Sequence, residues 1–291
     1  MVNKDLSLLQ LHSMDEYYAY AHANKENHQY KHLILEELLE EAKSGVVQEN
    51  GMLKIGGVSY PANCATQFDL SMGGDTTDIN WRESLICPIT LTNNRQRAAV
   101  HFFDLLSKPS TSDMIWVSEQ VTPLYRVIDQ RFPNTIGSEF LGSSLASGSV
   151  NKEGTRHEDF TKLSFDDESL DHIISLDCLE HIPDYECALS EAARTLKPGG
   201  TFTATFPFDI NSQENLIRAE VNEDGQIVHH LEPEYHGDPV TGKGVLCYQV
   251  FGWQVLDQLV ACGFSQASIF LMWSQKYAYL GPDQVIIFAK K

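Results

Sequence analysis

The sequence has no long apolar run and is poor in basic residues. Lys and Arg number 21 against 40 Asp and Glu, which gives a formal net charge of −19. A membrane-spanning helix needs roughly 20 consecutive apolar residues, and binding to a phosphate backbone needs clustered Lys and Arg. The composition therefore argues against a membrane protein and against a nucleic-acid partner, and we expect the acidic surface to serve solubility.

The cysteines show no C-x-x-C spacing, and the N-terminus lacks the features of a secretory signal. The opening residues, MVNKDLSLLQLHSMDEYY, contain neither a long apolar core nor a small-residue cleavage site. In an intracellular chain of this size, cysteines are expected to be reduced thiols. The sequence thus predicts a cytoplasmic protein without disulfides. The cysteines are Cys64, Cys87, Cys178, Cys187, Cys247 and Cys262.

Residues 163–208 predict a strand, a helix and a second strand in that order. A buried strand, His172 to Leu176, ends on the acidic Asp177. Apolar residues at helical spacing follow Pro183, and Lys197-Pro198-Gly199-Gly200 ends that helix before the strand Thr201 to Phe206. Such a unit favours a parallel sheet covered by helices, with ligand bound at the carboxyl ends of the strands. The helical apolar positions are Ala188, Leu189, Ala192, Ala193 and Leu196.

This stretch resembles the middle of a class I S-adenosylmethionine-dependent methyltransferase. The residues that carry the resemblance are LSFDDESLDHIISLDCLEH, followed by EAARTLKPGG. The resemblance implies an α/β fold: a doubly wound, mostly parallel seven-stranded Rossmann-like sheet over residues 108–291, with a substrate-side insert at 209–246. It also implies methyl transfer from S-adenosylmethionine, which is then the expected cofactor.

The first strand of the expected domain lacks the glycine-rich loop that most of this family carries. Met114 to Val117 reads as that strand, and SEQVTPLYR follows it. Glycines normally let the backbone approach the ligand there, whereas here Thr122 and Pro123 begin a helix at once. A subset of the family has this E-Q-x-T-P-L-Y form. We therefore expect Glu119, Gln120 and Thr122 to bind the cofactor in place of the glycine-rich loop.

The other cofactor positions come from the resemblance. Glu139, at the end of a strand over Thr135 to Phe140, falls where the family binds the ribose hydroxyls, although it could also be a surface residue at a strand end. Asp159 would accept from the adenine amino group, and Phe160 would pack on the ring. Asp177 and Cys178 would face the methionine part.

His181 is the first candidate for a catalytic base. Histidine titrates near neutral pH and could take the proton of an acceptor hydroxyl. The alternative is a structural histidine bonded to a loop carbonyl. His236, in the segment HHLEPEYHGDP, is the second candidate base, and the same segment supplies His229, His230 and Tyr235 as candidate substrate contacts.

The same segment also contains residue types that bind metals. His229, Glu232 and His236 are all of a ligand type. Their spacing matches no metal motif, and Pro233 interrupts the segment. The sequence therefore predicts no metal there, and a polar substrate-binding loop is favoured over a plain surface loop.

The N-terminal residues 1–50 are expected to be a helical segment. Residues 13–43 have an N-cap candidate at Ser13 and an apolar stripe at Leu33, Leu35, Leu38 and Leu39. The stripe could pack against the main domain or a partner subunit, which allows a homodimer. It could also form a lid over the active site.

Residues 51–107 resemble a zinc ribbon that has lost half its ligands. GMLKIGGVSYP reads as a hairpin with Gly56-Gly57 at its turn. Pro61 and Thr90 stand where the ribbon pattern has cysteine, and only Cys64 and Cys87 remain. Two thiolates cannot close a tetrahedral site, so no zinc is expected. Asn93 to Leu106 should be a helix. Its Arg95, Arg97 and His101 are expected on a solvated face, although they could also lie near a substrate.

The favoured function is methyl transfer from S-adenosylmethionine to a small polar acceptor, preferably on oxygen. Two alternatives stay open. A non-catalytic S-adenosylmethionine-binding module is suggested by the missing glycines and cysteines. A protein methyltransferase is suggested by an acidic surface that could engage a basic partner. A nicotinamide-dependent oxidoreductase is disfavoured because the chain lacks the G-x-G-x-x-G turn.

Overall fold

The computed structural model describes residues 5–44, 53–71, 79–237 and 242–291. It separates into two compact units. Unit 1 comprises residues 1–11, 15–106 and 270–286, and unit 2 comprises residues 12–14, 107–269 and 287–291.

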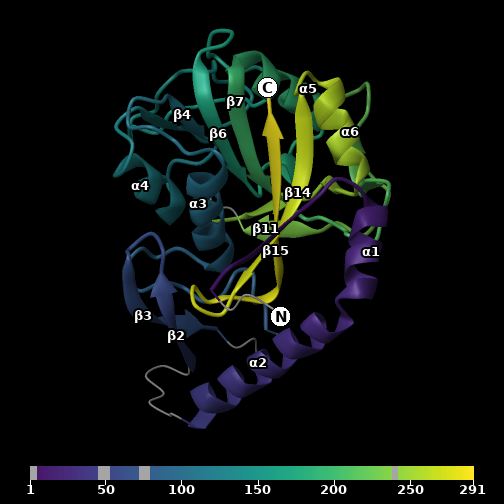
Figure 1. The fold of residues 1–291 in the computed structure, drawn as a ribbon. Coiled ribbons are helices and arrows are strands. Elements are labelled where there is room, and N and C mark those ends of the chain that lie inside the picture. Colours follow the sequence, from purple (N-terminus) through teal and green to yellow (C-terminus); the bar gives the residue numbers. More distant parts are fainter. Residues whose placement is uncertain (1–4, 45–52, 72–78, 238–241) are drawn as a thin grey trace. The chain divides into compact units, whose positions relative to one another are not determined.

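A seven-stranded sheet has the strand order β1-β14-β15-β7-β6-β4-β5. Pairing is parallel between β4 and β5, between β4 and β6, and between β6 and β7, and β15 joins β7 antiparallel through Ile287–Lys290. Figure 1 shows β4, β6 and β7 side by side. The mixed sheet with its parallel centre confirms the expected fold class. The bounds are β1 Ser7–Leu11, β4 Ile115–Val117, β5 Thr135–Gly137, β6 Leu170–Leu176, β7 Leu196–Thr205, β14 Gln266–Ser274 and β15 Tyr279–Lys290.

One edge strand was not predicted from the sequence. β1 comes from the N-terminal segment, which the sequence pattern assigned to helices only. At the other edge, beyond β5, a single parallel bridge joins Glu139 to His157. The pairing of β1 with β14 depends on residues far along the chain, which the pattern of the N-terminal segment does not reveal.

Side-chain caps begin two helices of unit 2, and the first of these caps was predicted from the sequence. Thr122 caps α4 (Pro123–Asp129), and its side chain accepts from the backbone N–H of Tyr125. Asp184 caps α5 (Tyr185–Thr195) by accepting from Cys187. The buried face of α5 includes the alanines and leucine that the periodicity selected. α6 (Gln254–Ala261) contacts α5 through Gln258, which donates to the Tyr185 hydroxyl at 2.8 Å.

The insert between β7 and α6 is built from short antiparallel pairs. β9 pairs with β10, β11 with β12, and β8 with β13. The middle pair sets His236 opposite Val245. The bounds are β8 Leu216–Ile217, β9 Ala219–Val221, β10 Ile227–His229, β11 Tyr235–Gly237, β12 Gly244–Leu246 and β13 Gln249–Val250. Asp238 and Pro239, at the end of the candidate loop, lie outside the described residues.

The expected N-terminal helix is two helices. α1 (Met14–Ala23) and α2 (Lys25–Ser44) are separated at Asn24, whose side-chain amide donates to the carbonyl of Tyr20. Ile34 rather than Leu33 is the buried apolar residue of α2, since Leu33 is 63% exposed. The expected stripe was therefore shifted by one residue at its start, while Leu35, Leu38 and Leu39 do pack on the core of unit 1.

The hairpin of unit 1 does not turn at its glycines. β2 (Leu53–Ser59) runs through Gly56 and Gly57, and the turn lies at residues 60–63 before β3 (Cys64–Leu70). An added Cβ on Gly57 would lie 3.1 Å from atoms of Phe68 and Ala278, so a close approach explains that glycine better than a turn does. In place of a four-thiol site, the Cys87 thiol donates to the Ser59 hydroxyl, and apolar residues such as Phe68 and Leu70 pack around it.

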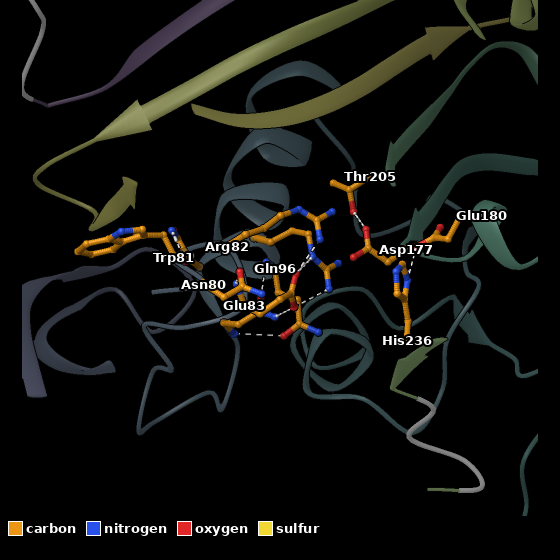
Figure 2. Close-up of polar contacts among 12 residues, drawn as sticks. Asn80, Trp81, Arg82, Glu83, Gln96, Asp177, Glu180, Thr205 and His236 are labelled. Carbon is orange, nitrogen blue, oxygen red and sulfur yellow. Dashed lines mark hydrogen bonds and ion pairs between the residues drawn. The ribbon is translucent and has the colours of Figure 1, made fainter. Parts of the chain in front are cut away.

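α3 (Asn94–Leu106) forms where predicted, but its cations do not face solvent. Arg97 is 0% exposed and His101 is 5% exposed. Arg95 is also buried, and it donates to the Glu83 carboxylate, which lies beside Arg82 and Asn80 in Figure 2. The prediction of a solvated face was wrong because tertiary partners, invisible in the helix sequence, bond each of these side chains.

His101 should make the stability of the protein fall in mild acid. Its ring stacks on Tyr60 with centroids 3.7 Å apart and donates to the Tyr279 hydroxyl, and burial lowers its pKa to about 4. An unfolded histidine titrates near 6.5. Between these values, protons bind only the unfolded chain, so stability is full above about pH 6.5 and falls by about 2–3 kcal/mol as pH drops to about 4.

The measurement is urea unfolding of the wild type and of His101→Phe at pH 7.5 and pH 5. The phenylalanine keeps an aromatic ring against Tyr60 but cannot titrate. The variant should lose less stability between the two pH values than the wild type does. An equal loss in both proteins would show that other groups cause the acid sensitivity.

No helix among the described residues is both long enough and apolar enough to cross a membrane.

Candidate functional site

The loop after β4, which replaces the expected glycine-rich turn, is held by Glu139. One carboxylate oxygen of Glu139 accepts from the backbone N–H of Gln120 at 2.6 Å and of Val121 at 2.9 Å. Glu139 is 8% exposed. A buried carboxylate with two backbone donors fixes the path of this loop without glycine. The structure thus gives Glu139 a defined bonding role at the carboxyl edge of the sheet, beyond that of a surface residue.

Gln120 extends this connection to the segment at residues 154–156. Its side-chain oxygen accepts from the backbone N–H of Arg156 at 2.7 Å, and its amide donates to the carbonyl of Gly154 at 3.1 Å. Glu119 beside it is half-buried, and Thr122 uses its hydroxyl to cap α4. These three predicted cofactor residues therefore lie on one loop, where Gln120 and Thr122 make structural bonds.

The two residues expected at the adenine are engaged within the protein. Asp159 accepts from the backbone N–H and the hydroxyl of Thr161 through one oxygen. Phe160 is 5% exposed and packs edge-to-face on Trp116 with centroids 4.7 Å apart. The ring of Phe160 therefore packs against the side chain of Trp116 on β4.

Asp177 follows β6 in a left-handed backbone conformation, with φ of 50°. That conformation is uncommon for a residue other than glycine and is often found at functional sites. Its carboxylate accepts from the Thr205 hydroxyl at 2.9 Å, as Figure 2 shows, and its N–H bonds the Thr205 carbonyl. Burial raises the pKa of the neighbouring Cys178 thiol to about 12, so this thiol stays protonated at neutral pH.

A short turn, η1 (Leu179–His181), connects β6 to α5 and is anchored by the insert. The amide of Gln249 donates to the carbonyls of Leu179 and Ile182 at 2.6 and 3.1 Å. The backbone N–H of Tyr248 donates to the carbonyl of Glu180 at 2.7 Å. These bonds bring residues about seventy positions apart in the sequence against the carboxyl end of β6.

Glu180, His181 and His236 meet at this turn. Oε1 of Glu180 lies 3.5 Å from Nδ1 of His236 and 3.8 Å from Nε2 of His181. The two imidazole rings are 5.1 Å apart at their centroids and nearly perpendicular. Figure 2 shows His236 pointing toward Glu180. The structure thus brings together the two histidines that the sequence nominated as bases, with a glutamate between them.

The electrostatics of this cluster are set by the burial of Glu180, whose side chain is 0% exposed. Burial raises the pKa of Glu180, and the contact with Glu180 raises the pKa of His236. His181 donates from Nδ1 to the carbonyl of Leu246 at 2.9 Å, since a carbonyl can only accept. His181 therefore makes the bond to a loop carbonyl that the sequence analysis gave as the alternative to a catalytic role. Its other ring nitrogen, Nε2, faces Glu180.

The remaining candidate substrate residues lie on exposed hairpins of the insert. Tyr235 on β11 is 60% exposed. His229 on β10 is exposed, and His230 lies 3.5 Å from the Glu220 carboxylate. None of these three side chains belongs to the cluster of metal-ligand types found among the described residues.

Two residues of the site were not nominated from the sequence. Glu180 sits inside the L-E-H motif, four residues after the end of β6, and its place beside His181 was the available signal. Thr205 bonds Asp177 from the next strand, and only the register of β6 against β7, which pairs Leu176 with Thr205, reveals that contact.

A protein-family model described as a methyltransferase domain matches residues 125–204. The match runs from α4 through β5, β6 and α5 into β7. It includes Glu139, the Asp177 turn, and the Glu180 and His181 members of the cluster.

Solved structures, among them methyltransferases, are similar at low identity. One from Mesorhizobium loti is 15% identical, covers 67% of this chain and 100% of its own, and has a TM-score of 0.42. Streptomyces venezuelae DesVI is 12% identical, covers 67% of this chain and 91% of its own, and has a TM-score of 0.41. A Haemonchus contortus phosphoethanolamine N-methyltransferase 2, solved with phosphomonomethylethanolamine and S-adenosylhomocysteine, is 18% identical, covers 60% of this chain and 38% of its own, and has a TM-score of 0.37. At these scores the likenesses carry no argument about the acceptor.

The family match falls on the segments that build the parallel centre of the sheet and the carboxyl-edge turn after β6. Residues 125–204 of the chain therefore match a methyltransferase domain.

Proposed function

We propose that this enzyme transfers the methyl group of S-adenosylmethionine to a hydroxyl of a small polar acceptor, which binds at the Glu180–His181–His236 cluster. The observation that carries the proposal is the position of this cluster, directly after Asp177 at the carboxyl end of β6. Ligands of open α/β sheets bind outside the carboxyl ends of the strands.

The cofactor residues are proposed from the family resemblance and from the contacts of the loop after β4. Glu139 would bind the ribose hydroxyls with the oxygen not used for Gln120 and Val121, while Asp159 would accept from the adenine amine. Asp177 and Cys178 would face the methionine part, next to the cluster. With the cofactor bound in this order, its methyl group would lie on the side of Glu180 and His181.

The chemistry requires alignment and removal of one proton. The sulfonium of the cofactor is already activated, so the protein mainly orients the acceptor in line with the methyl and excludes water. A hydroxyl must lose its proton as the new bond to carbon forms. Nε2 of His181 is the proposed proton acceptor, because Nδ1 of the same ring already donates to the carbonyl of Leu246. The side chain of His181 is 16% exposed, so an acceptor can reach it.

Two measurements test the proposal together. Calorimetry with S-adenosylmethionine and S-adenosylhomocysteine should show binding of both to the full chain. Methyl-labelled cofactor should then transfer its label to a pool of small hydroxylated compounds and leave protein extracts unlabelled. Binding without transfer to either pool would favour a binding module, and label in proteins would favour a protein methyltransferase.

Glu139→Gln should weaken binding of S-adenosylhomocysteine about 10–100-fold, because charge-assisted hydrogen bonds are worth about 1.5–3 kcal/mol. The amide keeps the size of the side chain, but it accepts more weakly from Gln120 and Val121 and from ribose hydroxyls. Calorimetry on the purified variant measures the change. Glu153→Gln, an exposed position beside the same loop, should bind as the wild type does. Equal affinity of the Glu139 variant would remove this residue from the cofactor site.

A further inference from the structure

The cluster at η1 presents three electron-pair donors to a common point. The groups are the carboxylate of Glu180, Nε2 of His181 and Nδ1 of His236, and their ligand atoms all lie within 4.8 Å of one another. The sequence pattern argued against metal because it grouped His229, Glu232 and His236. The fold instead combines His236 with a glutamate and a histidine from the turn after β6.

In each histidine, the ring nitrogen that does not face Glu180 already has a hydrogen-bond acceptor. Nδ1 of His181 donates to the carbonyl of Leu246 at 2.9 Å. Nε2 of His236 is paired with the Glu234 carboxylate at 3.3 Å, which leaves it the protonated nitrogen of a neutral ring. In neutral imidazoles, the two nitrogens that face Glu180 therefore carry lone pairs. Such acceptors behind each ring are the usual outer partners of metal-binding histidines.

Glu180 is the second, independent indication. Its side chain is 0% exposed, and neither carboxylate oxygen has a hydrogen-bond partner among the described residues. A buried carboxylate without hydrogen bonds is costly unless a cation or proton neutralises it. A protonated His236 can supply that charge, and a divalent cation bound between the three groups would take its place.

We propose that Glu180, His181 and His236 form a binding site for one divalent transition-metal ion, with Zn²⁺ as the first candidate. The separations of 3.5 and 3.8 Å from Glu180 to the two nitrogens are close to the ligand spacing of about 3.4 Å that tetrahedral Zn²⁺ with bonds of about 2.1 Å requires. Two histidines and one carboxylate are a known zinc ligand set that leaves one position open. The histidine side chains are 16% and 29% exposed, so that position faces solvent.

This inference deepens the proposed function and rests on it only for the role of the ion. An ion in the open site would bind the oxygen of the acceptor and favour its ionised form. His181 would then be a ligand, and the ion rather than the imidazole would activate the hydroxyl. Metal binding itself is independent of methyl transfer and can be measured without cofactor or acceptor.

The experiment uses the full chain with any purification tag removed, stripped with chelator and then incubated with Zn²⁺ or Co²⁺. Elemental analysis after gel filtration should show one ion per chain, and bound Co²⁺ should give the intense visible bands of a four-coordinate site. Glu180→Gln and His236→Asn should weaken binding by at least about 100-fold. His32→Asn, an exposed histidine on α2 paired with Glu36, is the matched control and should bind as the wild type does.

A stoichiometry well below one ion in the wild type would overturn the proposal. Binding by Glu180→Gln and His236→Asn equal to that of the wild type would also overturn it, because the ion would then lie elsewhere. If Glu180→Gln fails to fold by circular dichroism, His236→Asn, at a partly exposed position, decides alone. Stoichiometric Zn²⁺ with no methylation of hydroxylated compounds would leave the site standing and reject the function. Turnover in chelator without Zn²⁺ binding would reject the site and keep His181 as base.

Discussion

His181→Ala should lower kcat about 10²–10⁴-fold, the range that a positioned proton acceptor contributes. Its affinity for S-adenosylhomocysteine should stay nearly unchanged, because His181 is not among the residues proposed to bind the cofactor. The physical reason is the direction of the ring. Nδ1 donates to Leu246, and Nε2 points into the cluster with Glu180 and His236.

Single-turnover kinetics with labelled cofactor measure kcat separately from cofactor binding, which calorimetry reports. Free imidazole should restore part of the rate, since it can enter the space that the alanine leaves. His32→Ala, on an exposed face of α2, is the control for loss of a histidine without loss of the cluster. An unchanged rate in His181→Ala would remove this residue from the mechanism, and a proportional loss of cofactor affinity would make it a positioning residue.

The sequence predicted the central strand–helix–strand unit well because its signals are local. Apolar spacing predicted α5, whose alanines and Leu189 are buried. The helix ends at Thr195, so Leu196, which was predicted to be helical, and Lys197-Pro198-Gly199-Gly200 belong to β7 instead. The start of α4 at Thr122 and Pro123 was predictable for the same reason. Local signals of this kind depend on no partner elsewhere in the chain.

Long-range contacts explain most of what the sequence did not predict. β1 is a strand because it pairs with β14, and Glu180 matters because Leu246, Tyr248 and His236 come back against its turn. The sequence named both histidines of the cluster but could not show that they meet. It likewise grouped His229 with His236 by proximity along the chain, whereas the fold leaves His229 exposed on another hairpin.

The same limitation applies to α3. The helix was predicted, but the burial of its cationic side chains was not. A cation on a helix is solvated in most proteins, so Arg97 was assigned to a surface. In the structure, its guanidinium donates to the carbonyls of Tyr277, Leu85 and Ala278 at 2.7, 3.2 and 3.2 Å. It also lies 3.8 Å from the centroid of the Phe68 ring. Burial lowers its pKa to about 10, so it stays charged at neutral pH.

Arg97→Met should therefore destabilise the protein by about 3–5 kcal/mol, the cost of removing one partner from a buried, charge-assisted network. The methionine fills part of the volume, so the loss reports mainly the three carbonyls left without a donor. Urea unfolding at pH 7.5 measures the free energy. Lys54→Met is the matched control, because the exposed pair of Lys54 with Asp69 in the same unit is worth at most about 1 kcal/mol.

Arg97→Lys separates charge from geometry. A lysine keeps the positive charge but cannot direct donors to three carbonyls from a planar group. We therefore expect Arg97→Lys to lower the free energy of unfolding, but by less than Arg97→Met does. A loss below about 1 kcal/mol in Arg97→Met would mean that solvent or a rearranged chain satisfies the carbonyls. In that case, packing around Phe68 and Leu70, rather than the buried guanidinium, would be what replaces the missing cysteines in holding the ribbon-like hairpin.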